Sequence, residues 1–215
     1  MRVYPYIYWM LETSSAVPPN TVIVPIRSLG PSHRDRIAIH LRALDGNDRY
    51  LRFGYQATDD QIQRYVDGLD FERDDIFGIY NRKLELIAVA HLAFSAPVEH
   101  RSCAEFGVSV LKKVRGRGYG SRLFQRAVIH GRNHGIDLLF IHALSENAAM
   151  LKIARNGGAA LERYGSETEA YLRLPPATLD SHVSELVGEQ VALTDYRFKQ
   201  QARNFRDFRD FLGRL

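Results

Sequence analysis

The stretch AEFGVSVLKKVRGRGYG, residues 104–120, decides the fold of this chain. An apolar strand runs directly into a loop with four cations and with glycine at positions 116, 118 and 120, and a helical pattern follows. Glycine lets a backbone turn tightly and approach a ligand without a Cβ in the way, so consecutive N–H groups can point at phosphate oxygens. The stretch therefore predicts a strand, an anion-binding loop and a helix.

The helix after the loop strengthens this prediction. From Tyr119 onward, Leu123, Phe124, Ala127 and Val128 recur at helical spacing. The unpaired amides at the start of such a helix favour a diphosphate. Other nucleotide motifs fit poorly, because the lysine and hydroxyl of a Walker loop and the third glycine of a dinucleotide loop are both missing.

The loop Arg115-Gly116-Arg117-Gly118-Tyr119-Gly120 resembles the acyl-CoA-binding motif of the GNAT superfamily of N-acetyltransferases, Q/R-x-x-G-x-G/A. The likeness extends to both sides: Val108-Ser109-Val110 is similar to the family's fourth strand, residues 136–143 to its fifth, and Asn147 to the residue that opens the next helix. The resemblance implies an α/β sandwich whose mixed, mostly antiparallel sheet is splayed between strands four and five, with helices on both faces. It also implies acetyl-CoA as the co-substrate.

The resemblance assigns cofactor binding to the following residues. They are Val108, Val110, Arg115, Gly116, Arg117, Gly118, Tyr119, Gly120, Ser121 and Asn147. In the family a bulge in the fourth strand exposes backbone groups to pantetheine, so a backbone N–H near Val110 would polarise the thioester carbonyl. No metal ion is expected in this chemistry.

Acetyl transfer to a protonated amine also needs a base near the acceptor. Glu105, on the predicted fourth strand, is the first candidate, and the protein-lysine branch of the family uses a glutamate in this strand in that role. The structural alternative is a strand glutamate paired with a neighbouring cation. His91 and His142 are weaker candidates, because a histidine in a strand is more often a satisfied structural residue.

The sequence departs from the family at the position seven residues after Asn147. A tyrosine commonly stands there as the acid for the departing thiolate, and this chain has Ala154. A thiol with a pKa near ~8.5 leaves with little help at neutral pH. Ser145, Tyr119 or water remain as proton donors.

The acceptor amine cannot be read from these motifs. The run from Asp48 to Phe53, DRYLRF, is similar to the bacterial protein-lysine acetyltransferase branch. Acceptor specificity in the family lies in the first helices, here residues 44–71, and many substrates share the fold. A metabolite amine, an antibiotic, a protein lysine and a protein N-terminus all remain open.

Periodicity predicts an N-terminal arm over residues 1–20, one domain over 21–175 and a helical extension over 176–215. Within the domain we expect strands at 21–27, 76–80, 84–94, 101–111, 136–143, 159–164 and 169–174, and helices at 31–44, 58–69, 119–134 and 147–156.

The extension carries Phe198, Ala202, Phe205, Phe208 and Leu212 at helical spacing. An apolar stripe of this kind packs against the body of the protein or against a second subunit. A homodimer through the tail or the N-terminal arm is therefore one expectation.

Composition indicates a globular, cytoplasmic protein. A quarter of the 215 residues are charged, the net charge is +4, and Cys103 is the only cysteine, which precludes an internal disulfide. The apolar N-terminal run is interrupted by Pro5 and is too short to span a membrane. No membrane association is expected.

The function that these features favour is transfer of acetyl from acetyl-CoA to a primary amine of a small molecule or a protein. One alternative keeps the fold and the ligand without the chemistry, as a CoA-binding regulatory module, and Ala154 favours it. A second alternative is a basic nucleic-acid-binding protein that uses the arginines of the tail. The alternation of those arginines with phenylalanines argues against it, so no nucleic acid is expected as a partner.

Overall fold

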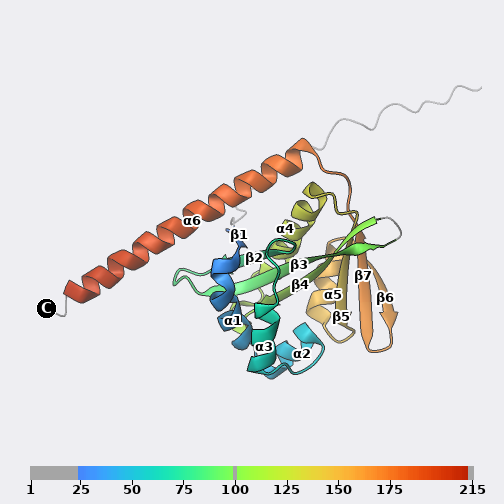
Figure 1. Cartoon of the computed structure of the whole chain (residues 1–215), viewed down its shortest axis with the longest axis horizontal. Helices are drawn as coiled ribbons and strands as arrows, with labels where there is room; N and C mark the ends of the chain where they lie inside the picture. Colours follow the sequence, from blue (N-terminus) through green and yellow to red (C-terminus); the bar gives the residue numbers. More distant parts are fainter. Residues whose placement is uncertain (1–23, 99–100, 213–215) are drawn as a thin grey trace, which may run out of the picture.

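A computed structural model of the chain describes residues 24–98 and 101–212 (Figure 1). In chain order the elements are β1 (Arg27–Leu29), η1 (Pro31–His33), α1 (Arg34–Arg42), α2 (Gly46–Phe53), α3 (Asp59–Asp67), β2 (Asp75–Tyr80), β3 (Leu86–Val98), β4 (Arg101–Val110), η2 (Lys112–Val114), α4 (Tyr119–Asn133), β5 (Leu138–Leu144), α5 (Ala148–Asn156), β6 (Ala160–Tyr164), β7 (Glu167–Arg173) and α6 (Leu179–Leu212). The arm expected over residues 1–20 lies outside the described residues.

The seven strands form one mixed sheet in the order β1-β2-β3-β4-β5-β7-β6. The pairing between β4 and β5 is parallel and the other pairings are antiparallel. The parallel pairing is short, because it joins only Cys103–Glu105 to Leu138–Phe140. Past Glu105 the two strands diverge, which confirms the splayed sheet expected from the sequence.

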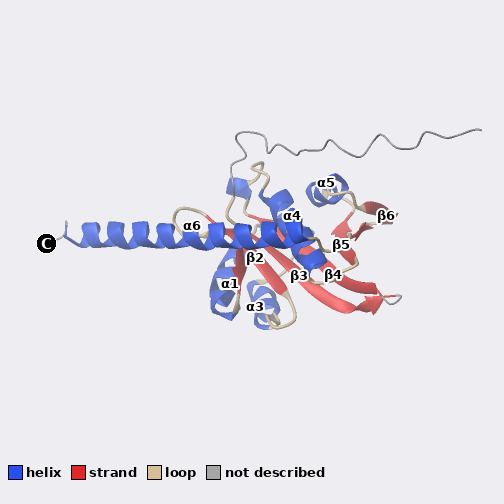
Figure 2. Cartoon of the chain, turned by 90° about the horizontal axis from the view of Figure 1, so that it is seen from above, coloured by secondary structure: helices blue, strands red, loops and turns tan. Residues whose placement is uncertain are grey.

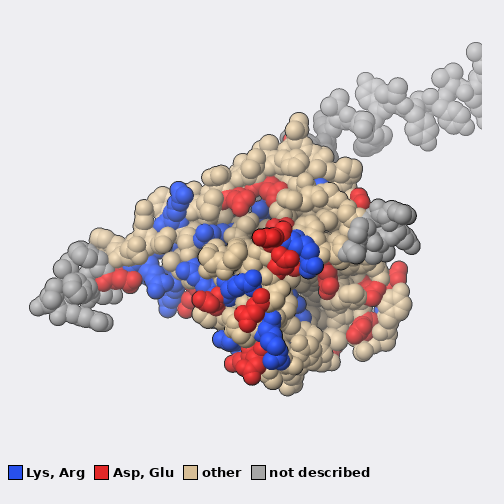
Figure 3. Space-filling model, in the orientation of Figure 1, with Lys and Arg blue, Asp and Glu red and all other residues tan. Residues whose placement is uncertain are grey.

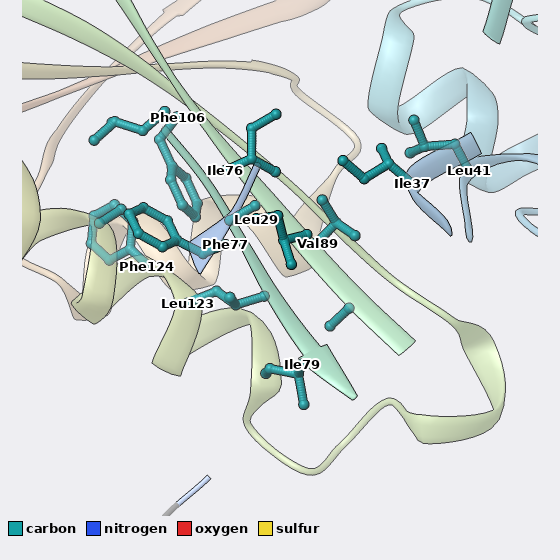
Figure 4. Packing of buried hydrophobic residues seen from close by; sticks show 14 of the residues in the cluster. Leu29, Ile37, Leu41, Ile76, Phe77, Ile79, Val89, Phe106, Leu123 and Phe124 are labelled. Atoms are coloured by element: carbon teal, nitrogen blue, oxygen red, sulfur yellow. The ribbon is translucent and has the colours of Figure 1, made fainter. Parts of the chain in front are cut away.

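Helices cover both faces of the sheet (Figure 2). Leu123 and Phe124 of α4 approach the core from one side, and Ile37 and Leu41 of α1 approach it from the other (Figure 4). Phe106 of β4 packs edge-on against Phe124, with ring centroids 5.2 Å apart. The core therefore holds β4 rigidly at its centre, and the strand runs from there to the splay.

The N-terminal helices differ in one respect from the expected pattern. Asp45, expected to end the first helix, instead caps α2, and its carboxylate accepts a hydrogen bond from the Asp48 amide. An aspartate at this position satisfies an otherwise unpaired helical N–H, so the same residue type fits the start of a helix as well as a turn. Thr58 caps α3 with a capping box to Gln61, as its position predicts. Of the strand expected at 21–27, residues 21–23 lie outside the described residues, 24–26 are not strand, and β1 begins at Arg27.

The bulge expected in β4 is wrong for this chain. Residues 103–110 of β4 pair with β3 in one unbroken register, and the register shift in this hairpin lies between Ser95 and Val98. The divergence of β4 from β5 therefore exposes the backbone of β4 without a bulge.

The C-terminal extension forms one 34-residue helix, α6, whose inner face packs on the domain. Glu185 contacts α4, Ala192 is buried, and Tyr196 meets Tyr80 of β2 edge-on. Phe198 and Phe205 are 66% and 70% exposed, so the body of the protein does not cover them, and packing against a second subunit, the other expected partner, stays a prediction. Within residues 24–98 and 101–212 no helix combines the length and the apolar composition that crossing a membrane requires.

Candidate active site

A cleft of about 880 Å³ opens where β4 and β5 diverge. Its walls come from the ends of β4 and β5, the loop after β4, the first turn of α4, and parts of α2 and α5. The lining includes Arg52, Glu105, Gly107, Val108, Ser109, Val110, Arg115, Gly116, Gly118, Tyr119, Gly120, Ser121, His142, Asn147 and Lys152. Most of the residues predicted for cofactor binding therefore lie together.

The backbone of β4 faces this cleft at alternate residues. The Leu111 amide donates to the Ile87 carbonyl of β3, whereas the Ser102 carbonyl accepts from the Asp137 amide, which lies just before β5. Backbone polar groups alternate in direction along a strand, so the amides of Val108 and Val110 point toward β5. Because β5 has diverged there, these amides are open to a ligand.

The three glycines of the loop have two different roles. Gly116 and Gly118 have φ of +77° and +75°, a left-handed conformation that side chains disfavour, and a Cβ at either position would meet nothing within 4 Å. A Cβ at Gly120 would instead come within 2.8 Å of Ile153 Cδ1. The first two shape the loop around open space, and the third lets α4 approach α5.

The start of α4 offers unpaired amides to the cleft. Gly118 is the N-cap residue and no side chain caps the helix there. The amides of Tyr119, Gly120 and Ser121 have no acceptor within the helix, because the first intrahelical bond in this turn is donated by Arg122 to Gly118. Unpaired amides at a helix N-terminus favour an anion, so this end of α4 is a candidate anion site.

The arginines of the loop differ in their surroundings. Arg115 is held by the buried Asp48 carboxylate at 2.6 Å and by the Val110 carbonyl at 3.1 Å. Its guanidinium therefore fixes the loop to α2 and β4. Arg117 is exposed and lies outside the lining of the cleft.

Asn147 joins the two helices at the far wall. Its side-chain oxygen caps α5 by accepting from the Met150 amide, and its NH2 donates to the Leu51 carbonyl of α2. The cap was expected from the sequence, and the second bond brings α2 to the cleft.

Glu105 lines the cleft with its side chain 55% exposed. The nearest basic group in the described part of the chain is His142 of β5, whose Nδ1 is 4.0 Å from the Glu105 carboxylate. The other ring nitrogen of His142 is 2.7 Å from Glu169. The structure thus brings two of the predicted candidates, Glu105 and His142, into one group, and Glu105 has no lysine or arginine partner among the described residues.

His91 lies outside the lining of the cleft, in a partly buried hydrogen-bonded chain. Its Nε2 is 3.0 Å from Asp74, and its Nδ1 is 2.8 Å from the hydroxyl of Tyr65. Burial lowers the pKa of His91, although the bond to Asp74 opposes this shift. Both ring nitrogens are engaged, which leaves neither free to act on a substrate.

Two positions that the sequence analysis considered for the acid, Ser145 and Ala154, lie outside the lining of the cleft. The Ser145 hydroxyl contacts the Gly165 carbonyl and Thr168 Oγ1, so the structure does not bring this candidate acid to the site. Ala154, on α5, is fully buried. Tyr119 is the candidate proton donor from the sequence that does line the cleft.

Sequence reasoning missed Arg52, Tyr55 and Lys152, which also line the cleft. The run from Asp48 to Phe53 was noticed only as a family likeness. The run belongs to α2, which lies beside the point where β4 and β5 diverge, so Asp48 and Arg52 line the cleft. No local sequence pattern indicates that α2 contacts the cleft.

Comparison with known proteins gives the same assignment. Residues 44–157, more than half of the chain, match the sequence model of the acetyltransferase (GNAT) family. No curated protein matches the chain by sequence.

Three solved structures illustrate the similarity in fold. The GNAT domain of S. lividans PAT is 18% identical with a TM-score of 0.60, covering 71% of this chain and 95% of that one. An N-acetyltransferase from Staphylococcus aureus Mu50 is 15% identical with a TM-score of 0.56, covering 70% and 98%. Spermidine N-acetyltransferase from Vibrio cholerae, in complex with CoA and spermine, is 18% identical with a TM-score of 0.56, covering 70% and 95%. The family match over the residues that build the cleft, together with this shared fold, shows that the chain belongs to the GNAT family of acetyltransferases.

Proposed function

We propose that the protein transfers an acetyl group from acetyl-CoA to a primary amine by direct attack. One observation carries the proposal: β4 offers open backbone amides at Val108 and Val110 and, on the same strand, the exposed carboxylate of Glu105. A thioester bound along the amides would therefore lie near a base.

The cleft suits the parts of acetyl-CoA in order along its length. The open space around Gly116 and Gly118 and the free amides of α4 suit the diphosphate. The amides of Val108 and Val110 suit the pantetheine chain and the thioester carbonyl. Lys152 of α5, which also lines the cleft, adds a positive charge near the phosphates.

The reaction needs one proton acceptor and one stabilised oxyanion. Glu105 takes a proton from the acceptor ammonium, directly or through water, and the neutral nitrogen attacks the thioester carbon. The carbonyl oxygen becomes an oxyanion next to the Val110 amide. Collapse breaks the C–S bond, the nitrogen loses its second proton, and the thiolate takes up a proton from Tyr119 or water. The net products are the amide, the free thiol and one proton.

Direct attack is favoured over an acyl-enzyme intermediate, because neither Cys103 nor Ser109, the two candidate nucleophiles, is placed to attack the thioester. Cys103 is buried and lies outside the lining of the cleft. Ser109 does line it, and its hydroxyl is 2.8 Å from His40 Nε2. The other nitrogen of His40 faces the Leu86 carbonyl, so Nε2 is the acceptor. Burial lowers the pKa of His40 to about 4, which makes this imidazole a poor base at neutral pH.

The deciding experiment measures thiol release from acetyl-CoA with a panel of amines, using the wild type and Glu105→Gln. The variant keeps its size and loses its basicity, so we expect turnover to fall by ~100-fold or more while acetyl-CoA affinity is unchanged. Glu167→Gln is the matched control, because Glu167 lines the same cleft from β7. It should leave turnover of a small amine within about twofold.

Two outcomes would contradict the proposal. Normal turnover by Glu105→Gln across pH 6–9 would place the base elsewhere. A folded protein that binds acetyl-CoA tightly but releases thiol with no amine would be a CoA-binding module, the alternative that the buried Ala154 favours.

A further inference from the structure

Within residues 24–98 and 101–212, one face of the outer strands β7 and β6 has no helix packed on it, and α2 contacts the neighbouring strand β5. The strands alternate strictly: Leu139, Ile141 and Ala143 of β5 and Thr168 and Ala170 of β7 are buried on one face, where α5 packs. Figure 2 shows α5 on that side, and α1 and α3 on the opposite side over the other half of the sheet. In the described part of the chain the remaining face of β7 and β6 is therefore open, next to the cleft that β5 lines.

This open face is continuous with the candidate base. Glu105 lies opposite Phe140 of β5, and Phe140 lies opposite Tyr171 of β7. In the next row His142 lies opposite Glu169, which lies opposite Glu162 of β6. Paired residues in a sheet project from the same face, so these rows lead outward from Glu105 and the cleft that it lines.

The open face is acidic, although the whole chain carries a net charge of +4. We call it the acidic sheet face and define it by Glu105, Phe140, His142, Glu162, Tyr164, Glu167, Glu169 and Tyr171. Acidic side chains are visible over β6 and β7 in Figure 3. In the described part of the chain none of its four carboxylates forms an ion pair with a lysine or an arginine. Arg173 projects from the same side at the far end of β7, opposite Leu138 and beyond Tyr171, and within the described residues it forms no ion pair with the four carboxylates.

The aromatic residues of the face orient its carboxylates. The Tyr164 hydroxyl donates to Glu162 at 2.6 Å, and the Tyr171 hydroxyl donates to Glu169. Tyr171 also packs edge-on against Phe140 with ring centroids 5.2 Å apart. Tyr164 is 59% exposed. The surface thus combines fixed negative charge with flat aromatic area, and cationic side chains bind to both.

We propose that the acidic sheet face binds a basic, extended segment of polypeptide, and that the acceptor amine is presented to Glu105 by such a segment. The inference rests on the proposed function and assigns its substrate class. A free small amine would occupy only the cleft beside Glu105. Charges as far out as Glu162, two strands beyond β5 in the sheet order, can contact only an acceptor that extends past the reacting amine.

The test compares two peptides with the same acceptor lysine, one flanked by lysine and arginine and the other by serine and glycine, and adds a small primary amine. We expect a KM for the basic peptide at least ~10-fold below that for the neutral peptide at low salt. This advantage should shrink as salt rises, because the surface is exposed and its charges are screened.

Glu162→Lys and Tyr164→Ala test the surface away from the reacting centre. Each should raise the KM for the basic peptide, by ~10-fold for the charge reversal, and leave kcat and the kinetics of the small amine unchanged. Glu72→Lys, an equal charge change at an exposed residue between α3 and β2, is the control. A glutamate-flanked peptide should become a better acceptor for Glu162→Lys than for the wild type.

Equal kinetics for Glu162→Lys and Glu72→Lys would overturn the inference. Sedimentation gives the particle masses of the wild type and of Glu162→Lys. If the variant is a smaller assembly than the wild type, the face binds a second copy of the chain, and this result would also overturn the inference. If small amines are acetylated and the peptide results are negative, the proposed function stands and only this inference fails. If no amine of any kind is acetylated, the proposed function itself fails.

Discussion

The guanidinium of Arg52 lies directly over Gly107 of β4: a Cβ at residue 107 would meet Arg52 Nη2 at 2.8 Å. The same nitrogen donates to the Tyr65 hydroxyl at 3.0 Å. Tyr65 must then donate to His91 Nδ1, and His91 Nε2–H to Asp74, because a guanidinium can only donate and a carboxylate can only accept. The absent side chain at Gly107 thus gives Arg52 the space to join α2 to α3 and β3 at the wall of the cleft.

Gly107→Ala should displace Arg52 and break its bond to Tyr65. We expect a loss of ~1–2 kcal/mol in the free energy of unfolding, since a hydrogen bond to a charged group is lost. In an Arg52→Ala background the same substitution should cost almost nothing, because the obstructing side chain is gone. Urea unfolding of the two single variants and the double variant gives the coupling energy, and strict additivity would contradict the contact.

Gly118→Val should block binding of acetyl-CoA. Its φ of +75° strains any side chain, and the Cβ would enter the space in front of the α4 amides. Gly135→Val is the control, since Gly135 has a φ of +73° and follows α4 at its other end. Both variants should lose stability by similar amounts, and only Gly118→Val should weaken acetyl-CoA binding in calorimetry. If the two folded variants bind acetyl-CoA with equal affinity, the loop at Gly118 is not part of the binding site.

Much of the fold was predictable, because its strongest signals are local. The helix at residues 119–133 and the capping box at Thr58 depend on contacts between residues three or four positions apart. Such contacts are visible in the spacing of residue types along the sequence. The first strand was misplaced because β1 has only three residues, too few for a periodic signal. Asp45 was misread because a turn and a helix cap use the same residue type.

The wall of the cleft was less predictable, because its contacts join distant segments. Arg52 and Gly107 are 55 positions apart, and nothing near either residue records their contact. The sequence left open for a related reason whether Phe198 packs against the body or against a second subunit. An apolar stripe predicts that one face of a helix packs against something, but it does not tell which partner. The residues of α6 that contact α4, such as Glu185, are polar and lie on another face of the helix.

Ser109→Ala separates direct attack from an acyl-enzyme. The Ser109 hydroxyl serves to satisfy the buried Nε2 of His40, so its removal should cost ~1–2 kcal/mol of stability and change turnover by less than ~3-fold. A covalent route through Ser109 would instead lose turnover almost completely. Mass spectrometry of the wild type mixed with acetyl-CoA alone provides the second readout, and an acetylated peptide containing Ser109 would contradict direct attack.

A charge cluster at the base of α6 joins the tail helix to the domain. His130 of α4 lies between two carboxylates, with Nε2 at 2.7 Å from Asp75 of β2 and Nδ1 at 2.5 Å from Glu185 of α6. Arg126 of α4 also contacts Glu185 at 2.7 Å, and His134 stacks on His130 with ring centroids 3.9 Å apart. Burial disfavours the charged imidazole, but the bonds to Asp75 and Glu185 raise the pKa of His130 to about 9.

The stability of this junction should therefore fall on the alkaline side. The folded pKa of His130, about 9, is above its ordinary value of 6.5, so its contribution is complete below pH 6.5 and is lost as the pH rises through 9. Burial would raise the pKa of Glu185, but the bonds from His130 and Asn133 lower it to about 2, so its contribution is lost only as the pH falls from 4.5 toward 2. The stabilisation is greatest between pH 4.5 and 6.5.

Urea unfolding at pH 6 and pH 9.5 tests this junction. The wild type should lose on the order of 2 kcal/mol more than His130→Gln between the two pH values, because the variant has no proton to lose at this site. His134→Gln is the control: it changes the neighbouring exposed histidine and should keep the wild-type pH dependence. If His130→Gln and the wild type lose equal stability over this interval, the imidazole is not charged in the folded protein, and α6 must be held by its other contacts, such as the ion pair between Arg126 and Glu185.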